Sequence, residues 1–187
     1  LHPGVKASVS PDVLRKSNLL VLAVPCQHQR AWLASMRDAI AAECIIVNAS
    51  KGLENGTCLT MSRVVMEELA FLSPRYAVLS GPSFAAEVMD GQPTAIVLGC
   101  EDENLGAGLR QIFSTSFFRC YSCTDVTGVE MGGALKNVMA IAAGIGDGLG
   151  FGSNARAALI TRGLAELSRL GTAMGANPLT FMGLSGL

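Results

Sequence analysis

Charge is scarce in this chain of 187 residues and nowhere forms a block. Only 16% of the residues are Asp, Glu, Lys or Arg, and the formal net charge is −1. Nucleic acids and anionic membranes attract clustered basic residues, so we expect neither as a partner. A long apolar run is absent too, because the uncharged span 137–146 is too short and too rich in Gly and Ala to cross a membrane.

Histidine is equally scarce, with only His2 and His28 in the chain. One cysteine pair, Cys120-x-x-Cys123, has metal-ligand spacing, but a structural zinc needs four ligands and no second such pair occurs. We therefore predict no metal site. The six cysteines lie mostly in expected strands and helices of a domain large enough to fold without disulfides. They indicate free thiols in a reducing compartment, and thus a cytoplasmic protein.

Apolar segments typical of strands and helices alternate along the first two thirds of the chain. The expected strands span 5–9, 19–24, 44–48, 76–79, 94–98 and 117–121, and the expected helices 12–16, 27–40, 57–69, 83–89 and 104–113. Ser10-Pro11 provides a helix cap, and the continuous aliphatic run 19–24 is typical of a parallel strand that is covered on both faces. This order predicts an α/β fold with a doubly wound parallel sheet.

The pattern changes to helices alone from Thr127 onward. One expected helix spans 129–145, and a second runs from a cap at Ser153 or Asn154 to about residue 174. Thr124-Asp125 offers a cap before the first of them. We therefore expect an α/β domain over residues 1–124 and an all-helical domain over residues 125–187.

Lys136 is the first candidate for chemistry, because it is the only charged residue between Glu130 and Asp147. Burial among small and apolar residues lowers the pKa of a lysine toward neutrality. Such a lysine can exchange a proton with a carbonyl or alcohol oxygen. The alternative is a lysine that extends its ammonium group from a core helix to water.

Polar and glycine-containing segments follow three of the expected strands, at 24–26, 50–52 and 81–83. Ligands of parallel α/β sheets gather beyond the carboxyl ends of the strands, so these segments should frame one crevice. Gly81-Pro82-Ser83 is expected to open a short helix whose free amides favour a phosphate ester, although a simple turn with Ser83 as the helix cap fits equally well. Lys51 could pair with the phosphate or be an ordinary surface lysine.

Four blocks in the chain carry a family resemblance. They are Ala23-Val24-Pro25 with Arg30, Ser50-Lys51-Gly52-Leu53-Glu54, Ser80-Gly81-Pro82-Ser83-Phe84-Ala85, and the segment GALKNVMAIAAGIGDGLGFGSN from Gly133 to Asn154. Together they closely resemble the bacterial-type NAD(P)-dependent glycerol-3-phosphate dehydrogenases. Proteins of that family extend beyond both ends of this chain. We therefore expect a fragment that begins after the first βαβ unit and stops inside the C-terminal domain.

The resemblance implies reversible hydride transfer between NAD(P)H and dihydroxyacetone phosphate, which gives sn-glycerol 3-phosphate for glycerophospholipid synthesis. It implies NAD or NADP as cofactor, a Rossmann-like dinucleotide-binding domain over 1–124, a substrate domain over 125–187, and a homodimer at full length. The substrate is then a small phosphate ester.

The resemblance also assigns roles to single residues. Lys136 is the implied proton donor and acceptor. Substrate contacts are implied for Lys51, Gly81, Ser83 and Lys136, cofactor contacts for Lys51 and Ala85, and positioning roles for Asn137 and Asn154. Cys26 departs from the family, since many relatives carry serine after the Val-Pro pair, and this change puts only a minor hydrogen bond near the cofactor in doubt.

The dinucleotide fingerprint G-x-G-x-x-G follows none of the expected strands, so we expect the 187-residue chain alone to bind NAD(P) poorly. Two other interpretations remain open. The 6-phosphogluconate and 3-hydroxyacid dehydrogenases also place a lysine on the first helix after a dinucleotide domain, but with an asparagine three or four positions later, whereas Asn137 adjoins Lys136 here. The chain could also be a non-catalytic, dimer-forming remnant of the same fold.

Overall fold

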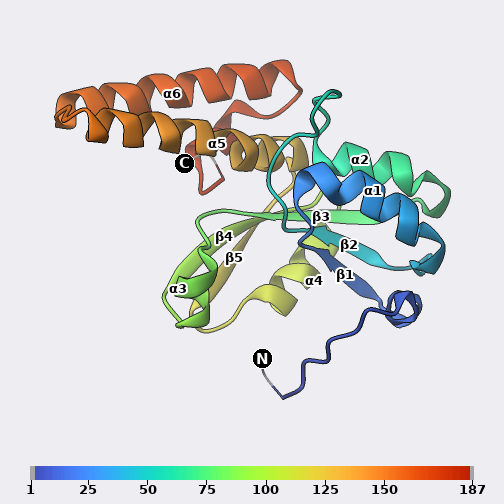
Figure 1. Cartoon of the computed structure of the whole chain (residues 1–187). Coiled ribbons are helices and arrows are strands. Elements are labelled where there is room, and N and C mark those ends of the chain that lie inside the picture. The colour runs from blue at the N-terminus through green and yellow to red at the C-terminus, as the bar shows by residue number, and fades with distance from the viewer. Residues whose placement is uncertain (1–2, 186–187) are drawn as a thin grey trace.

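The computed structural model describes residues 3–185 of the chain and contains a five-stranded sheet. Its strands lie in chain order: β1 (Leu19–Leu22), β2 (Ile45–Asn48), β3 (Arg75–Ser80), β4 (Thr94–Gly99) and β5 (Phe118–Cys123). Helices α1 (Cys26–Met36) and α2 (Met61–Glu68) lie on one face, and α4 (Glu103–Phe113) lies on the other (Figure 1). The expected α/β sheet is thus confirmed.

The core has a layer on each face of the sheet, because successive strand residues point to opposite faces. Ile46 and Val78 pack with residues of α1 and α2, whereas their neighbours Val47 and Ala77 pack with Leu105 and other residues of α4. Covering on both faces explains why β2 and β3 are almost continuously apolar. The sheet is therefore a rigid platform, and its strand ends are fixed in space.

One strand pair differs from the expected parallel sheet. β1, β2 and β3 are parallel to one another and β4 is parallel to β5, but β3 and β4 are antiparallel. The connection between them, residues 81–93, contains only the five-residue helix α3 (Ala85–Met89). A parallel crossover needs a longer helix that returns across the sheet face. Only β1, β2 and β3 therefore bring their carboxyl ends to a common edge.

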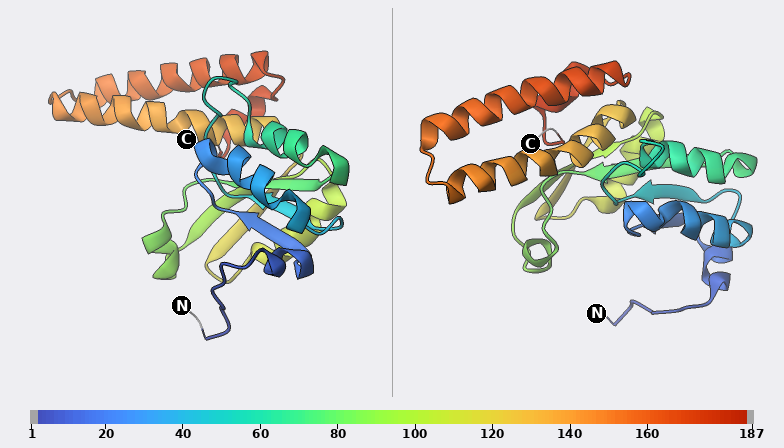
Figure 2. Two further views of the ribbon diagram at one scale, coloured as in Figure 1. Left: turned by 45° about the vertical axis from the view of Figure 1, so that its right-hand side comes forward. Right: turned by 45° about the horizontal axis from the view of Figure 1, so that its top comes forward.

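After the sheet the chain forms an antiparallel helical hairpin of α5 (Val126–Gly148) and α6 (Ser153–Ala173). Figures 1 and 2 show that the start of α5 lies against the sheet and that the hairpin projects beyond it. Asp125 caps α5 by accepting a hydrogen bond from the Gly128 amide, 2.9 Å, as expected. Its other carboxylate oxygen accepts from Thr180 Oγ1, 2.6 Å, which ties the 3-10 helix Pro178–Met182 to the same point.

Two local expectations are wrong. Residues 5–9 form no strand, and Val9 is fully exposed, because alternating apolar residues make a stable strand only beside a partner strand. Helix α6 is capped by Gly152 and not by Ser153 or Asn154, which both lie in its first turn. The cap at Ser10 is confirmed, although the following segment, Pro11–Lys16, is a 3-10 helix. Residues 186 and 187, the end of the apolar terminal run, lie outside the described part.

Candidate active site

Two lysines meet at the carboxyl edge of β1, β2 and β3. Lys51 follows β2, and its Nζ donates a hydrogen bond to the Gly81 carbonyl beyond β3, 2.9 Å. Ser50 Oγ donates to the Val24 carbonyl beyond β1, 2.5 Å, so the three strand ends are joined. Lys136 of α5 is half-buried and lies close enough to Lys51 for each lysine to affect the pKa of the other. The crevice expected from the sequence is therefore present, with both candidate lysines in it.

A cavity of about 440 Å³ opens beside the lysine pair. Gly81, Ser83 and Asn137 line it together with Lys51 and Lys136. The remaining wall consists of Pro82 and of apolar side chains from Phe84, α5 and α6. A mostly apolar hollow with a few converging polar groups is typical of a small-molecule site. Two amino groups in its wall fit an anionic ligand such as a phosphate ester.

The two lysines affect each other's pKa, and Lys136 is the acid/base candidate of the pair. Burial lowers the pKa of Lys136 to about 8, and the positive charge of Lys51 contributes to the same shift. Burial also lowers the pKa of Lys51, but its hydrogen bond to Lys136 opposes that effect. Lys136 therefore gains or loses a proton readily near pH 8, beside a second amino group whose pKa burial also lowers.

Gly81 is required by the backbone at the end of β3. Its φ is +144°, and a Cβ at this position would lie 2.9 Å from the Cα of Ile96 on β4. An L side chain is strained in that region of φ and would collide with backbone that cannot move aside. Glycine therefore lets the chain turn sharply over β4 and present the carbonyl that holds Lys51.

The other sequence-predicted residues lie at different distances from this cavity. Asn137 and Ser83 line it, and both are exposed. The expectation that Ser83 opens a helix is wrong, since α3 begins at Ala85 with Phe84 at its N-cap and has only five residues. Ala85 itself lies just outside the lining. Asn154 lies in the first turn of α6, beyond the turn of the hairpin, and lines neither this cavity nor the next.

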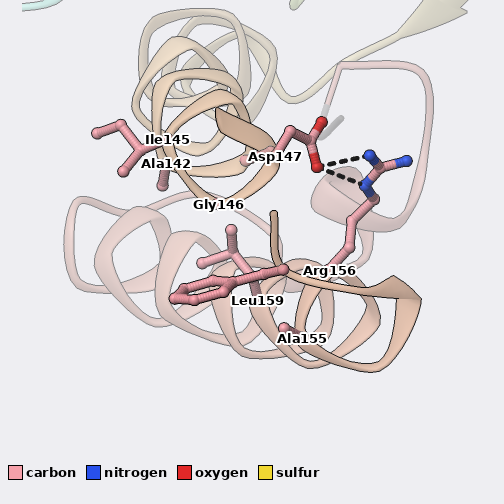
Figure 3. A pocket seen from close by; sticks show the side chains of 9 residues that line it. Ala142, Ile145, Gly146, Asp147, Ala155, Arg156 and Leu159 are labelled. Carbon is pink, nitrogen blue, oxygen red and sulfur yellow. Dashed lines mark hydrogen bonds and ion pairs between the residues drawn. The ribbon is translucent and has the colours of Figure 1, made fainter. Parts of the chain in front are cut away.

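A second hollow, of about 290 Å³, lies between the helices of the hairpin (Figure 3). Its wall is apolar, with Ala142, Ile145 and Leu159 among the side chains. Its only charged groups are Asp147 and Arg156, which form an ion pair of 2.5 Å. Because that pair neutralises both charges, this hollow offers no free acid, base or nucleophile. The candidate acid/base groups therefore lie beside the other cavity, which Lys51 and Lys136 line.

The loop that carries Lys51 is held by α1, an arrangement that sequence reasoning missed. Arg30 donates to both carboxylate oxygens of Glu54, 2.7 and 3.0 Å, and also to Glu67 and Glu68 of α2, 2.7 Å each. Gln27 Nε2 donates to the Leu53 carbonyl, 2.7 Å. Two signals were available: positions 27 and 30 are neighbours on one helix face, and Arg30 and Glu54 both belong to the sequence blocks that carry the resemblance.

We predict that Arg30→Met lowers the free energy of unfolding by about 1–2 kcal/mol, because it removes a bidentate pair and leaves three carboxylates close together. Urea denaturation of the chain measures the change. The control is Arg162→Met, which removes an ion pair to Glu166 on the exposed surface of α6 and should cost at most about 0.5 kcal/mol. Equal costs for the two variants would contradict the special role of Arg30.

Glu130, six residues before Lys136, is the second group that sequence reasoning missed. It is buried and accepts hydrogen bonds from the Ser62 amide, 2.8 Å, the Ser62 hydroxyl, 2.5 Å, and the Tyr76 hydroxyl, 2.6 Å. Burial raises the pKa of Glu130. These hydrogen bonds connect the start of α5 to α2 and β3. They thereby fix the position of Lys136 relative to the strand ends.

Residues 3–185 offer neither a metal-binding cluster nor a membrane-spanning helix. No three side chains of His, Cys, Asp or Glu cluster in a way that could hold a metal ion in this part of the chain. No helix of these residues has both the length and the apolar character that a membrane span requires.

Comparison with known families places the chain. A family model described as "NAD-dependent glycerol-3-phosphate dehydrogenase N-terminus" matches residues 2–106, and the corresponding C-terminus model matches residues 125–187. The curated "Glycerol-3-phosphate dehydrogenase [NAD(P)+]" of Nitratidesulfovibrio vulgaris (strain DP4) is 59% identical over all of this chain and 57% of its own length. The protein of the same name from Desulfovibrio desulfuricans is 60% identical, over 56% of its length. The chain thus spans somewhat more than half the length of these relatives.

Solved structures agree with these matches. The glycerol-3-phosphate dehydrogenase of Coxiella burnetii superimposes with a TM-score of 0.84 and 40% identity, over 90% of this chain and 51% of that one. The glycerol-3-phosphate dehydrogenase of Plasmodium falciparum gives a TM-score of 0.88 at 25% identity, over 96% of this chain and 51% of that one. Because the family model of the N-terminal part alone covers more than half of the residues, the chain belongs to the NAD-dependent glycerol-3-phosphate dehydrogenase family.

Proposed function

We propose that the protein to which this chain belongs interconverts dihydroxyacetone phosphate and sn-glycerol 3-phosphate, with NAD(H) or NADP(H) as the hydride carrier. The observation that carries this proposal is the pairing of Lys51 with Lys136 beside a cavity large enough for a small phosphate ester. The names of the relatives, which are 59% and 60% identical to this chain, support the same reaction.

The two lysines have separate tasks in this reaction. Reduction of the ketone places negative charge on its oxygen, and the Lys136 ammonium stabilises that charge and donates the proton. In the reverse direction the neutral amine of Lys136 accepts the proton of the alcohol. Lys51 keeps its charge and attracts the phosphate ester. Gly81 and Ser83 contact the substrate and Asn137 positions it, whereas Asn154 lines neither cavity and is assigned no contact with the substrate.

The site fits a nicotinamide cofactor. The parallel strands β1, β2 and β3 end side by side at this edge, where ligands of such sheets bind. Phe84 is 73% exposed beside the cavity and offers a flat apolar surface to a ring. Lys51 and Ala85 are the residues that would contact the cofactor, which supplies the hydride when bound.

The remaining assignments complete the proposal. Residues 1–124 belong to a dinucleotide-binding domain, and residues 125–187 belong to a helical substrate domain. The whole protein is a cytoplasmic homodimer that feeds glycerophospholipid synthesis. Helices α5 and α6 expose many apolar side chains, among them Val138, Ile141 and Ile145, each about 60% exposed. Such a surface supports the proposal that these helices are buried further in the assembled protein.

A hybrid enzyme tests the activity. In it, this chain replaces the matching 57% of the Nitratidesulfovibrio vulgaris relative, and NADH or NADPH absorbance is followed after addition of dihydroxyacetone phosphate. We expect substrate-dependent oxidation of the cofactor. A folded hybrid that oxidises neither cofactor, beside an active parent enzyme, would contradict the proposal and favour a non-catalytic remnant.

The pH dependence of the hybrid tests the role of Lys136. With a pKa of about 8, Lys136 is protonated below that pH and neutral above it. Because ketone reduction needs the ammonium and alcohol oxidation needs the amine, kcat/KM for reduction should fall above pH 8 and kcat/KM for oxidation should rise toward a plateau there. Profiles in both directions with no inflection below pH 10 would contradict the assignment.

A further inference from the structure

The hydroxyl of Ser80 is the one buried serine oxygen with no hydrogen-bond partner among residues 3–185. Ser80 is the last residue of β3, 2% exposed, and lies immediately before the glycine whose carbonyl holds Lys51. A buried hydroxyl that lacks a partner loses its hydrogen bonds to water without replacement. Such a group in a native structure needs an explanation, and an ordered water molecule is a frequent one.

Helix α5 passes directly over this hydroxyl. A Cβ on Gly133 would lie 2.5 Å from Ser80 Oγ and 3.7 Å from the Cγ of Lys51. The missing side chain at position 133 therefore leaves room where the end of β3, the stem of Lys51 and α5 come together. Gly133 stands one helical turn before Lys136, so this contact also sets the approach of the second lysine.

A small cavity occupies that point. Its volume is about 10 Å³, close to the space that one water molecule requires. Ser80, Lys51, Glu130 and Gly133 are among the residues that line it. Lys51 also lines the large cavity, so the two spaces share this residue.

The lining residues and the volume of this small cavity indicate which ligand it can hold. Lys51 disfavours a cation, and the Glu130 carboxylate beside it already accepts hydrogen bonds from Ser62 and Tyr76. A volume of about 10 Å³ excludes a phosphate or a carboxylate. The Ser80 hydroxyl can both donate and accept, and an ammonium has three N–H donors, of which the Gly81 carbonyl takes one. A polar cavity of this size with several polar neighbours is the kind that holds water, whereas dry cavities are apolar.

We propose that this cavity is a binding site for one ordered water molecule. Ser80 holds this water by a hydrogen bond, and the water hydrates the Lys51 ammonium. Ser80 is then a positioning residue that acts on the lysine pair through this water, without touching a ligand in the large cavity. The site is a property of the folded chain and does not depend on the proposed dehydrogenase activity.

A crystal structure of the 187-residue chain tests the site directly. We expect electron density for a water within hydrogen-bonding distance of Ser80 Oγ in the unsubstituted chain, and no ordered water there in Ser80→Ala. An empty cavity in the unsubstituted chain, or a Ser80 hydroxyl bonded to a protein group instead, would overturn the proposal. The unsubstituted crystal decides the question even if the variant does not crystallise.

Titration of lysine side chains in the same chain, followed by NMR of isotope-labelled lysine, tests the positioning role. Loss of a hydrating water disfavours the charged form, so Ser80→Ala should lower the titration midpoint of Lys51 by about one pH unit, a tenfold change in proton affinity. The control is Ser122→Ala, an exposed serine of β5, which should leave the midpoint unchanged. An unchanged midpoint in a folded Ser80→Ala chain would contradict the role.

Discussion

Replacement of Lys136 by methionine should lower kcat for ketone reduction by about 10³-fold in the hybrid enzyme, within the range that a positioned general acid contributes. Methionine keeps most of the length and the apolar character of the lysine stem, so it preserves the packing of α5 while it removes the proton donor. Affinity for NAD(P)H should change little, because in the proposed reaction Lys136 contacts the substrate oxygen and not the cofactor. Steady-state kinetics and cofactor fluorescence measure the two effects separately.

Lys136→Arg distinguishes proton transfer from simple charge. Arginine keeps the positive charge but holds its proton at all accessible pH values, so it should restore little of the lost turnover. The control is Lys16→Met, at an exposed lysine outside the site, and it should leave turnover unchanged. Turnover close to that of the unsubstituted hybrid in Lys136→Met would remove Lys136 from the mechanism.

Replacement of Lys51 by methionine has the second largest expected effect and acts in two ways. The loss of a charged partner for the phosphate should raise KM for dihydroxyacetone phosphate by roughly 10- to 100-fold, the range for a hydrogen bond to a charged group. The loss of its positive charge should also raise the pKa of Lys136, because like charge contributes to the lowering of that pKa.

The pH at which kcat/KM changes therefore reports on the interaction between Lys51 and Lys136. In Lys51→Met it should move above pH 8, whereas Lys51→Arg should leave it near its original place because the charge is kept. A raised KM with an unmoved inflection in Lys51→Met would show that the two lysines do not interact in the working enzyme. An inflection at lower pH would contradict the electrostatic account outright.

The sequence alone was sufficient for the features that depend on short-range pattern. Continuous aliphatic runs predicted β1 and β2, and parallel strands necessarily bring their carboxyl ends to one edge, so the meeting of Lys51 with Gly81 followed. The direction of the pKa shift of Lys136 followed from its small and apolar neighbours. The resemblance of the sequence blocks to a known family added the reaction, which pattern alone does not give.

Features that depend on long-range contacts could not be predicted in this way. The antiparallel pairing of β4 with β3 depends on how far the connecting segment 81–93 can reach. A run of apolar residues predicts a strand but does not indicate whether it is parallel or antiparallel to its neighbour. Glu130 meets Tyr76 across 54 positions, and Lys51 adds its charge to Lys136 across 85 positions. Residues so far apart become neighbours only after the sheet and α5 are packed.

Direct titration of the Lys136 side chain, by NMR of the 187-residue chain with isotope-labelled lysine, tests the central claim most directly. The Lys136→Met spectrum identifies its signal, and the measurement requires neither cofactor nor substrate. A midpoint near pH 8 would establish the acid/base group on which the proposed reaction depends. A midpoint near 10.5, the ordinary value for lysine, would contradict the account, because Lys136 would then stay protonated and could not accept the proton of an alcohol.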